Sequence, residues 1–178
     1  MADTRTFTCP TPQNINPLSP VGYQFNVTKL PDLSFFAQEV NLPGITLGEP
    51  EFGTPFAKIP IPGETLQYEQ LTLTFLVDEG MKNYRSIYNW MVALGFPQSY
   101  SQYITLSSDD TVNYTELATN YSDATLLILN NNNTASQPVH FKDVFPVALD
   151  SLQFSSTQND VQYLMGRVSF RFSYYDFV

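Results

Sequence analysis

The sequence has little cysteine and little histidine. Cys9 is the only cysteine and His140 the only histidine among 178 residues. One cysteine cannot form an intrachain disulfide, so a disulfide-stapled module and a cysteine metal cluster are both excluded. No Cys, His or carboxylate cluster lies at ligand spacing from His140, so we interpret it as a strand residue and not as a metal ligand or catalytic base.

Positive charge is also scarce. Eight Lys and Arg residues stand against seventeen Asp and Glu residues, which gives a net charge of -9. The cations form no cluster along the chain: they are Arg5, Lys29, Lys58, Lys82, Arg85, Lys142, Arg167 and Arg171. A conventional nucleic-acid interface needs clustered Lys and Arg, so this class of function is excluded. The acidic balance instead repels DNA and anionic membrane surfaces.

Long apolar runs and catalytic motifs are missing too. No run approaches the ~20 apolar residues that span a bilayer. The first residues lack the apolar core of a signal peptide, so we expect a soluble protein made in a cytoplasm, with no membrane anchor. There is no Gly-x-Ser-x-Gly elbow and no Gly-rich phosphate loop, and the acidic pair Asp109–Asp110 is typical of a solvated surface. We therefore expect no enzyme activity and no catalytic, cofactor-binding or metal-binding residues.

Aromatic and uncharged polar residues are abundant. The chain has 14 Phe and 11 Tyr, and only 14% of its residues are charged. This composition favours strands and argues against a coiled coil or a charged disordered chain. The length suits one domain. The prolines within residues 1–20 predict an extended N-terminal arm, and residues 21–178 then form the β domain.

Residues 70–97 predict a strand that runs directly into the one strong helix. One set of apolar residues, Leu71, Leu73, Phe75 and Val77, alternates with Thr72, Thr74 and Leu76, which is typical of a strand with at least one buried face. Asp78 takes the helix N-cap position and Glu79 lies in the first turn, near the positive end of the helix dipole. One apolar stripe is expected to face the core: Met81, Tyr84, Ile87, Tyr88, Met91 and Leu94. The helix should stop at Gly95 and Pro97 and cover an open end or flank of a sheet.

Residues 41–64 combine recurrent Pro and Gly with apolar residues. A solvated linker would not need the apolar groups, and a segment so rich in proline cannot be a central strand. One interpretation is an extended β-arm or long hairpin over residues 45–64 that is buried against a neighbouring subunit. The other is an irregular loop folded back over its own core. The candidate intersubunit residues are Ile45, Leu47, Phe52, Phe56, Ile59 and Ile61.

The remaining segments predict further strands and one long loop. Alternating residues predict a strand over residues 23–28 and a second over residues 33–40, joined as a hairpin. Residues 98–124 are polar and rich in Tyr, which predicts a long surface excursion. Later strands are expected over residues 124–130 and over residues 139–155 with an interruption at Pro146. A long strand within residues 161–178 should close the chain.

Several short sequence motifs, taken in their order along the chain, resemble the tail-tube family of contractile phages, in particular the T-even-like tube and tube-initiator proteins. The first is the strand Tyr23–Thr28, and the second is the Asn41–Ile45 turn, which reads Asn-Leu-Pro-Gly-Ile. The others are the strand 71–77 followed by Asp78–Glu79, the helix with Tyr84, Tyr88 and Trp90, and the C-terminal Tyr174-Tyr175-Asp176. The resemblance covers residues 21–97 and 124–178.

The resemblance implies a mainly β fold of two packed antiparallel sheets, barrel-like or sandwich-like, with one flanking helix. It also implies homohexameric rings that stack into a tail tube, with each subunit donating strands to an inner β-barrel. The implied partners are copies of the chain itself and sheath, baseplate or neck proteins. Phage DNA would pass through the lumen without specific binding. The implied location is the virion tail, after assembly in the host cytoplasm.

Three alternatives remain at this stage. A tail terminator or other neck ring, and a type VI secretion tube subunit, share the implied architecture. A β-sandwich carbohydrate-binding module or small glycosidase that uses the Tyr-rich loop belongs to a different class. Spontaneous rings or tubes would exclude this last alternative, whereas a glycan-binding monomer would favour it.

Overall fold

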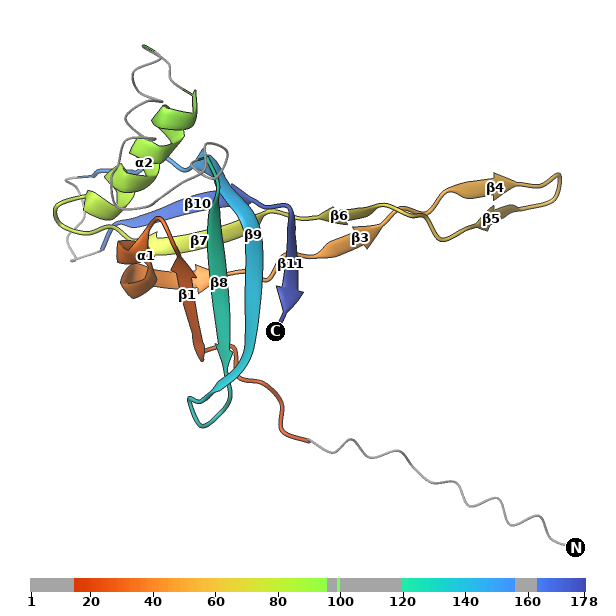
Figure 1. The fold of residues 1–178 in the computed structure, drawn as a ribbon, viewed down its shortest axis with the longest axis horizontal. Coiled ribbons are helices and arrows are strands. Elements are labelled where there is room, and N and C mark those ends of the chain that lie inside the picture. Colours follow the sequence, from red (N-terminus) through yellow and green to blue (C-terminus); the bar gives the residue numbers. More distant parts are fainter. Residues whose placement is uncertain (1–14, 96–98, 100–119, 156–162) are drawn as a thin grey trace, which may run out of the picture.

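The structure is a computed structural model that describes residues 15–95, 99, 120–155 and 163–178. Within these ranges, two antiparallel sheets share the long strand β9 (Figure 1). The first sheet contains β1 (Tyr23–Val27), β8 (Ser122–Leu129), the first part of β9 (Ala135–Leu149) and β11 (Tyr174–Phe177). The second contains the last part of β9, β10 (Met165–Arg171), β7 (Leu71–Leu76) and β2 (Ala37–Val40). The predicted fold class is confirmed.

Strand β9 changes partners at Asp143, whose backbone φ of 56° lies in the left-handed region. Just before this residue, Lys142 pairs with Tyr174 of β11, and just after it, Phe145 pairs with Arg171 of β10. Non-glycine residues adopt such a φ infrequently, so the regular ladder is broken at this point. In Figure 1 the strands of the second sheet accordingly cross those of the first.

The predicted interruption at Pro146 is wrong, because β9 continues through it. Pro146 pairs with Phe170, and Ser169 pairs with Ala148, so Val147 is left out of the register as a bulge. Proline has no N–H to give to a ladder and is tolerated where a bulge relaxes the pairing. Pro146 therefore lies at a local irregularity and does not end the strand.

The core lies between the two sheets and draws on alternate residues of both. Its most completely buried large side chains are Phe25, Phe75, Phe141, Phe170, Leu33, Leu71, Leu73 and Ile87. Helix α2 (Lys82–Gly95) packs on this core through Ile87 and Trp90. The Trp90 ring centroid lies 6.4 Å from that of Phe170. The strand predicted over residues 71–77 is confirmed over Leu71–Leu76. Gly95 is the last described residue of α2, and the predicted stop at Gly95 and Pro97 extends outside the described residues.

The predicted start of the helix is wrong. Helix α2 begins at Lys82, and the first helical hydrogen bond runs from Arg85 N to Met81 O. Asp78 precedes an extra turn, closed by Met81 N donating to Asp78 O, so Asp78 is not the N-cap. The buried Asn83 amide links the helix to the end of β7, because its Nδ2 donates to Leu76 O at 2.8 Å.

The predicted apolar stripe is only partly correct. The buried face of α2 contains Asn83, Ile87, Trp90 and Ala93. Tyr84, Met91 and Leu94 pack on its margin, whereas Met81 and Tyr88 are exposed. The helix is therefore rotated from the predicted stripe toward the side that carries its single Trp.

The predicted hairpin of residues 23–40 is also wrong. Residues 31–36 form a short helix, α1 (Pro31–Phe36), where the first half of the second strand was expected. β1 pairs with β8 in one sheet and β2 with β7 in the other. Proline is favoured in the first turn of a helix, and this helix carries the chain from one sheet to the other.

Two strand boundaries differ from those expected near the C-terminus. β8 begins at Ser122, inside the segment assigned to the surface excursion of residues 98–124. The closing strand is divided into β10 and β11, which pair with successive parts of β9. Residues 1–14, 96–98, 100–119 and 156–162, which include most of both the N-terminal arm and the excursion, lie outside the described residues.

Candidate assembly surface

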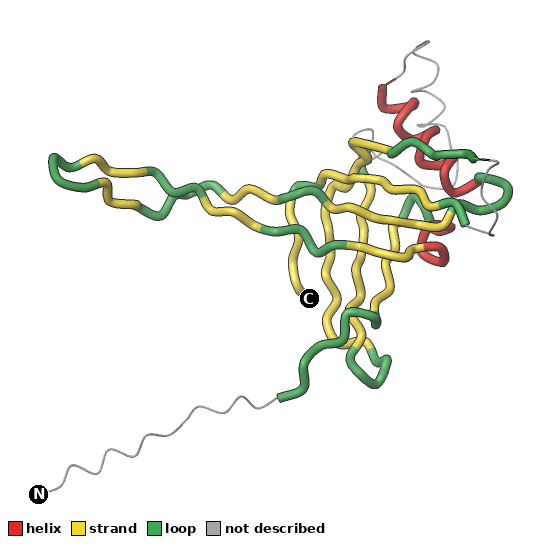
Figure 2. The backbone as a smooth tube through the Cα atoms, turned by 180° about the vertical axis from the view of Figure 1, so that it is seen from behind, coloured by secondary structure: helices red, strands yellow, loops and turns green. Residues whose placement is uncertain are grey.

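A two-stranded arm projects from the second sheet (Figure 2). Its root pairs β3 (Ile45–Leu47) with β6 (Leu66–Tyr68), and its outer half pairs β4 (Glu51–Gly53) with β5 (Lys58–Pro60). β2 leads into β3 and β6 leads into β7, so the arm prolongs two neighbouring strands of the body. Residues 45–68 are called the arm below.

The two halves of the arm meet at a close approach of two glycines. Gly63 N donates to Gly48 O at 2.7 Å, and Ile61 N donates to Pro50 O at 2.9 Å. A Cβ added to Gly63 would overlap the Gly48 carbonyl oxygen, so only glycine permits this approach. Prolines supply no N–H to the ladder, and the pairing is therefore short in each half.

The tip of the arm is a tight turn over residues 54–57. Thr54 N donates to Ala57 O at 3.0 Å, and Ala57 N donates to the Thr54 hydroxyl at 3.0 Å. This double closure fixes the turn locally, as Thr side chains do in ST-turns. Phe56 is presented at the tip with 98% of its surface exposed.

The structure brings all six candidate intersubunit residues together on the arm, with 44 to 98% of each exposed. They are Ile45, Leu47, Phe52, Phe56, Ile59 and Ile61. The segment is a projecting hairpin and not a loop folded back over the core. Exposed apolar side chains gathered on one projecting hairpin are unusual on an isolated protein, and such groups mark interaction sites. Contact with a neighbouring subunit stays a prediction.

The arm is longer than the predicted residues 45–64. The hairpin continues to Tyr68, and Leu66 adds a further exposed apolar side chain at the root. The available signal was the alternation of Leu66, Gln67 and Tyr68 directly after the Pro/Gly-rich segment. The arm is also acidic, with three Glu against one Lys over residues 45–68. That Lys58 forms an exposed ion pair with Glu51 at 2.6 Å.

Asn41 ties the root of the arm to the body, a role that the sequence did not reveal. Its backbone N donates to Thr72 O at 3.3 Å, and its side-chain Nδ2 donates to Gln70 O at 3.0 Å. Thr72 N in turn donates to Asn41 Oδ1 at 2.6 Å. The Asn41 side chain thus adds two hydrogen bonds between the segment that enters the arm and the segment that leaves it.

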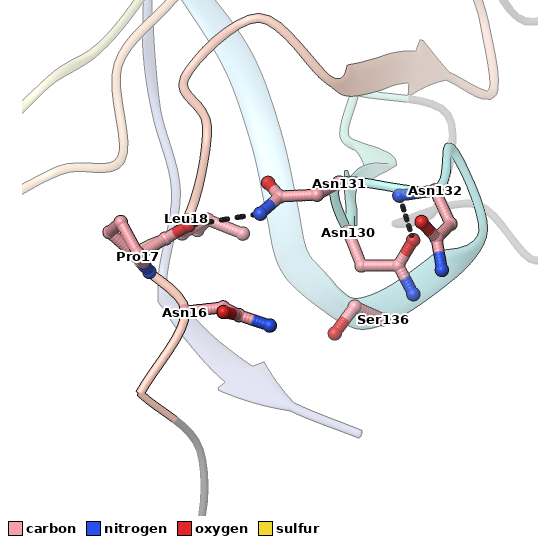
Figure 3. A pocket seen from close by; sticks show the side chains of 7 residues that line it. All are labelled: Asn16, Pro17, Leu18, Asn130, Asn131, Asn132 and Ser136. Atoms are coloured by element: carbon pink, nitrogen blue, oxygen red, sulfur yellow. Dashed lines mark hydrogen bonds between the residues drawn. The ribbon is translucent and has the colours of Figure 1, made fainter.

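The body carries a small notch between the N-terminal segment and the β8–β9 turn (Figure 3). Its volume is about 270 Å³, and it is lined by Asn16, Pro17, Leu18, Asn130, Asn131, Asn132 and Ser136. Asn131 Nδ2 donates to Pro17 O at 3.3 Å, which holds the segment against the turn. None of these lining residues is an acid, a base or a strong nucleophile, so the notch has no catalytic group.

Two lysines of the body lie in distinct electrostatic settings. Lys142 Nζ lies 2.7 Å from Asp123 Oδ2, and this hydrogen bond raises the pKa of Lys142. Lys29 Nζ lies 5.2 Å from the centroid of the Trp90 ring, and burial lowers the pKa of Lys29. Each lysine contacts a neighbouring side chain of the body, and the two do not form a basic patch among the described residues.

The described residues contain no cluster of three or more His, Cys, Asp or Glu that could hold a metal ion. His140 lies on β9, with its Nδ1 3.2 Å from the Thr125 hydroxyl, as the strand interpretation expects. Asp109 and Asp110 lie outside the described residues. Among the helices of the described chain, none has the length and apolarity needed to cross a membrane.

A family model described as phage tail tube protein matches residues 6–178. The tail tube terminator protein of Enterobacteria phage T4 is 28% identical over 143 residues, which cover 78% of this chain and 74% of that protein.

Two solved structures share the fold. One is a chain of the anti-feeding prophage baseplate, solved with six-fold symmetrisation, with a TM-score of 0.61 and 12% identity. The match covers 92% of this chain and 96% of that one. The other is the tube-terminating cap of the same prophage, with a TM-score of 0.60, 17% identity and 99% of both chains covered.

Proposed function

The chain belongs to the phage tail tube protein family, and on that premise we propose that it forms a ring of identical subunits at an end of the tail tube. It is a structural protein of the tube and terminator type and a component of the virion tail. The observation that supports the terminator position is the 28% identity with the T4 tail tube terminator over 143 residues. The role is assembly and not catalysis.

The ring is a homohexamer. The six-fold symmetrised baseplate that contains a chain of the same fold supports this number of copies. Within the described residues, β1 and β2 are edge strands, which expose unpaired backbone groups. A closed ring that pairs such edges between subunits removes them and gives a continuous barrel around a lumen.

The arm is the contact surface that joins subunits. Its apolar residues project from the body on a hairpin that no third strand covers within the described part of the chain. Burial of apolar surface provides the main driving force for association. The preformed tip turn and the glycine crossing limit the entropy that the arm loses on binding.

The lumen of the ring passes DNA without specific binding. A net charge of -9 and the absence of a basic cluster along the chain support this role. Sheath, baseplate or neck proteins are the partners that a ring at the tube end would contact. A type VI secretion tube subunit and a glycan-binding module stay alternatives that no observation on the described residues favours.

A second candidate is the main tube subunit or its initiator, which the description of the matching family favours. The two candidates differ in stacking. A terminator makes isolated rings that cap a tube, whereas a tube subunit makes rings that stack into long cylinders.

Negative-stain electron microscopy of the purified protein over a concentration series tests both candidates. Isolated six-fold rings are expected for a terminator, and long hollow tubes would favour the tube subunit. A triple variant, Phe52→Ser, Phe56→Ser and Ile59→Ser, should abolish ring formation and leave the circular dichroism spectrum of the body unchanged. Phe35→Ser removes an exposed aromatic from α1, with 83% of its surface accessible, and is the matched control.

A strict monomer at high concentration, alone and with tube preparations, would contradict the proposal. A glycan array would then test the carbohydrate-binding alternative. Rings that form normally with the triple variant would show that the arm is not the contact surface.

A further inference from the structure

The arm meets the body at a narrow root. Its strands pair only with each other within the described residues, and short isolated hairpins are marginally stable in water. The direction of the arm therefore depends on side chains that hold its root. Asn41 is one such residue, because its side chain forms hydrogen bonds with the backbone of Thr72 in β7 and of Gln70 just before β7.

A cluster of aromatic rings provides a second hold on the strand that leaves the arm. Tyr68, the last residue of β6, has its ring centroid 5.5 Å from that of Phe172 and 5.5 Å from that of Tyr175. Both of these rings pack on the fully buried Phe141, at 5.2 Å and 5.5 Å. A chain of ring contacts thus runs from the core to the root of the arm. Edge and tilted arrangements at such distances stabilise aromatic pairs.

Tyr175 also holds the strand that enters the arm. Its hydroxyl donates to Pro43 O at 3.2 Å, and the buried Pro43 lies between β2 and β3. One side chain therefore contacts both legs of the root, one through its hydroxyl and the other through its ring. Its neighbour Tyr174 makes neither contact and is exposed.

The position of Tyr175 depends in turn on the C-terminal strand. Tyr175 pairs with Phe141 of β9, and Ser173 N donates to Lys142 O at 2.9 Å at the start of β11. At the other end, Val178 N donates to Pro138 O at 3.1 Å. β11 is thus fixed to β9 along its whole length.

We infer that Tyr175 is a positioning residue for the arm, and that β11 holds it against both legs of the arm root. The last strand of the chain thereby sets the direction in which the apolar surface is presented to a partner. This assignment rests on the proposed function only in treating the arm as a contact surface. The direction of the arm itself is a property of the single chain.

Double electron–electron resonance between spin labels on Gln24→Cys in β1 and Ala57→Cys at the tip tests the inference. Cys9 is replaced by Ser in every variant, and samples are kept dilute so that the chain is monomeric. The parent should give one narrow distance distribution. Tyr175→Ala should broaden it about twofold or more, since an unsupported hairpin is mobile, and Tyr68→Ala should act in the same way.

Two further variants distinguish the contribution of the Tyr175 ring from that of its hydroxyl, and the contribution of Tyr175 from that of β11 as a whole. Tyr175→Phe keeps the ring contacts and loses the bond to Pro43 O, so its distribution should lie between those of the parent and Tyr175→Ala. Tyr174→Ala is the matched control and should keep the narrow parental distribution. Circular dichroism confirms that each variant retains the β body.

Parental distributions in both Tyr175→Ala and Tyr68→Ala would overturn the inference, even if the protein forms rings. Broadening in Tyr174→Ala equal to that in Tyr175→Ala would also overturn it, because loss of β11 as a whole would then be the cause. A parent that forms no rings would count against the proposed function and would leave the distance test unaffected.

Discussion

Strand β7 and the arm are adjacent in sequence and both carry large apolar residues, yet their side chains lie in opposite environments. Leu71, Leu73 and Phe75 are completely buried, whereas Phe52 and Phe56 in the arm are mostly exposed. β7 lies between β2 and β10 and faces a second sheet, while each arm strand pairs with a single strand among the described residues. Apolar content alone does not decide burial; the number of neighbouring elements does.

The largest expected contrast comes from removing one Phe from each region. Phe75→Ala in β7 should lower the free energy of unfolding by about 3–5 kcal/mol, through lost burial and a residual cavity. Phe56→Ala should change it by less than ~0.5 kcal/mol, because the side chain is exposed in the single chain. Urea unfolding of the monomer measures both values.

Equal losses of unfolding free energy in the two variants would contradict the difference in burial between β7 and the arm. A large loss for Phe56→Ala in the monomer would show that the arm tip packs on its own body. If rings are present, the experiment should be repeated at two protein concentrations, since association stabilises by mass action.

A smaller contrast is expected at two glycines. A Cβ on Gly166 of β10 would lie 2.8 Å from the Phe75 ring, so Gly166→Ala should cost about 1–3 kcal/mol by overpacking. A Cβ on Gly53 of the arm would meet no atom within 4 Å, and neither glycine has a positive φ. Gly53→Ala should therefore leave the free energy of unfolding unchanged or raise it by up to ~1 kcal/mol, because alanine lowers the conformational entropy of the unfolded chain.

Thermal unfolding followed by circular dichroism checks this pair. A crystal structure of the Gly166→Ala variant should show the Phe75 ring displaced. An unchanged thermal unfolding midpoint for Gly166→Ala would mean that the Phe75 ring moves without loss of stability. The core around Phe75 would then be less tightly packed than its contact with Gly166 implies.

The smallest expected effect is at the Lys58–Glu51 ion pair of the arm. Its side chains are 76% and 54% exposed, so Lys58→Ala should cost about 0.2–1 kcal/mol and less at high salt. Urea unfolding at low and high salt measures the difference. A loss that is larger and independent of salt would indicate that the pair is buried by something other than its own chain.

Local features that depend on a few neighbouring residues were predictable. The strands at residues 23–27 and 71–76 follow from the alternation of apolar residues along each segment. The six candidate residues of the arm were identified because apolar groups recur within a Pro/Gly-rich segment that cannot be a central strand. Their exposure could not be predicted, because it depends on which elements lie beside them.

Errors occurred where a distant partner decided the outcome. Pro146 remains inside β9 because Phe170 and a bulge accommodate it across the sheet. The buried face of α2 includes Asn83 because the carbonyl of Leu76 accepts its amide. Neither partner is visible in the local pattern of apolar residues.

By itself, the sequence determined a mainly β chain with one long helix, no disulfide and a strongly acidic charge balance. These properties depend on composition and on short-range periodicity, which each segment carries alone. Tertiary structure decided that β9 serves two sheets, that the helix turns Trp90 inward, and that the arm projects from the body. The physical reason is that burial and strand pairing are settled between segments far apart in the chain, where the free energy depends on the partner and not on the local sequence.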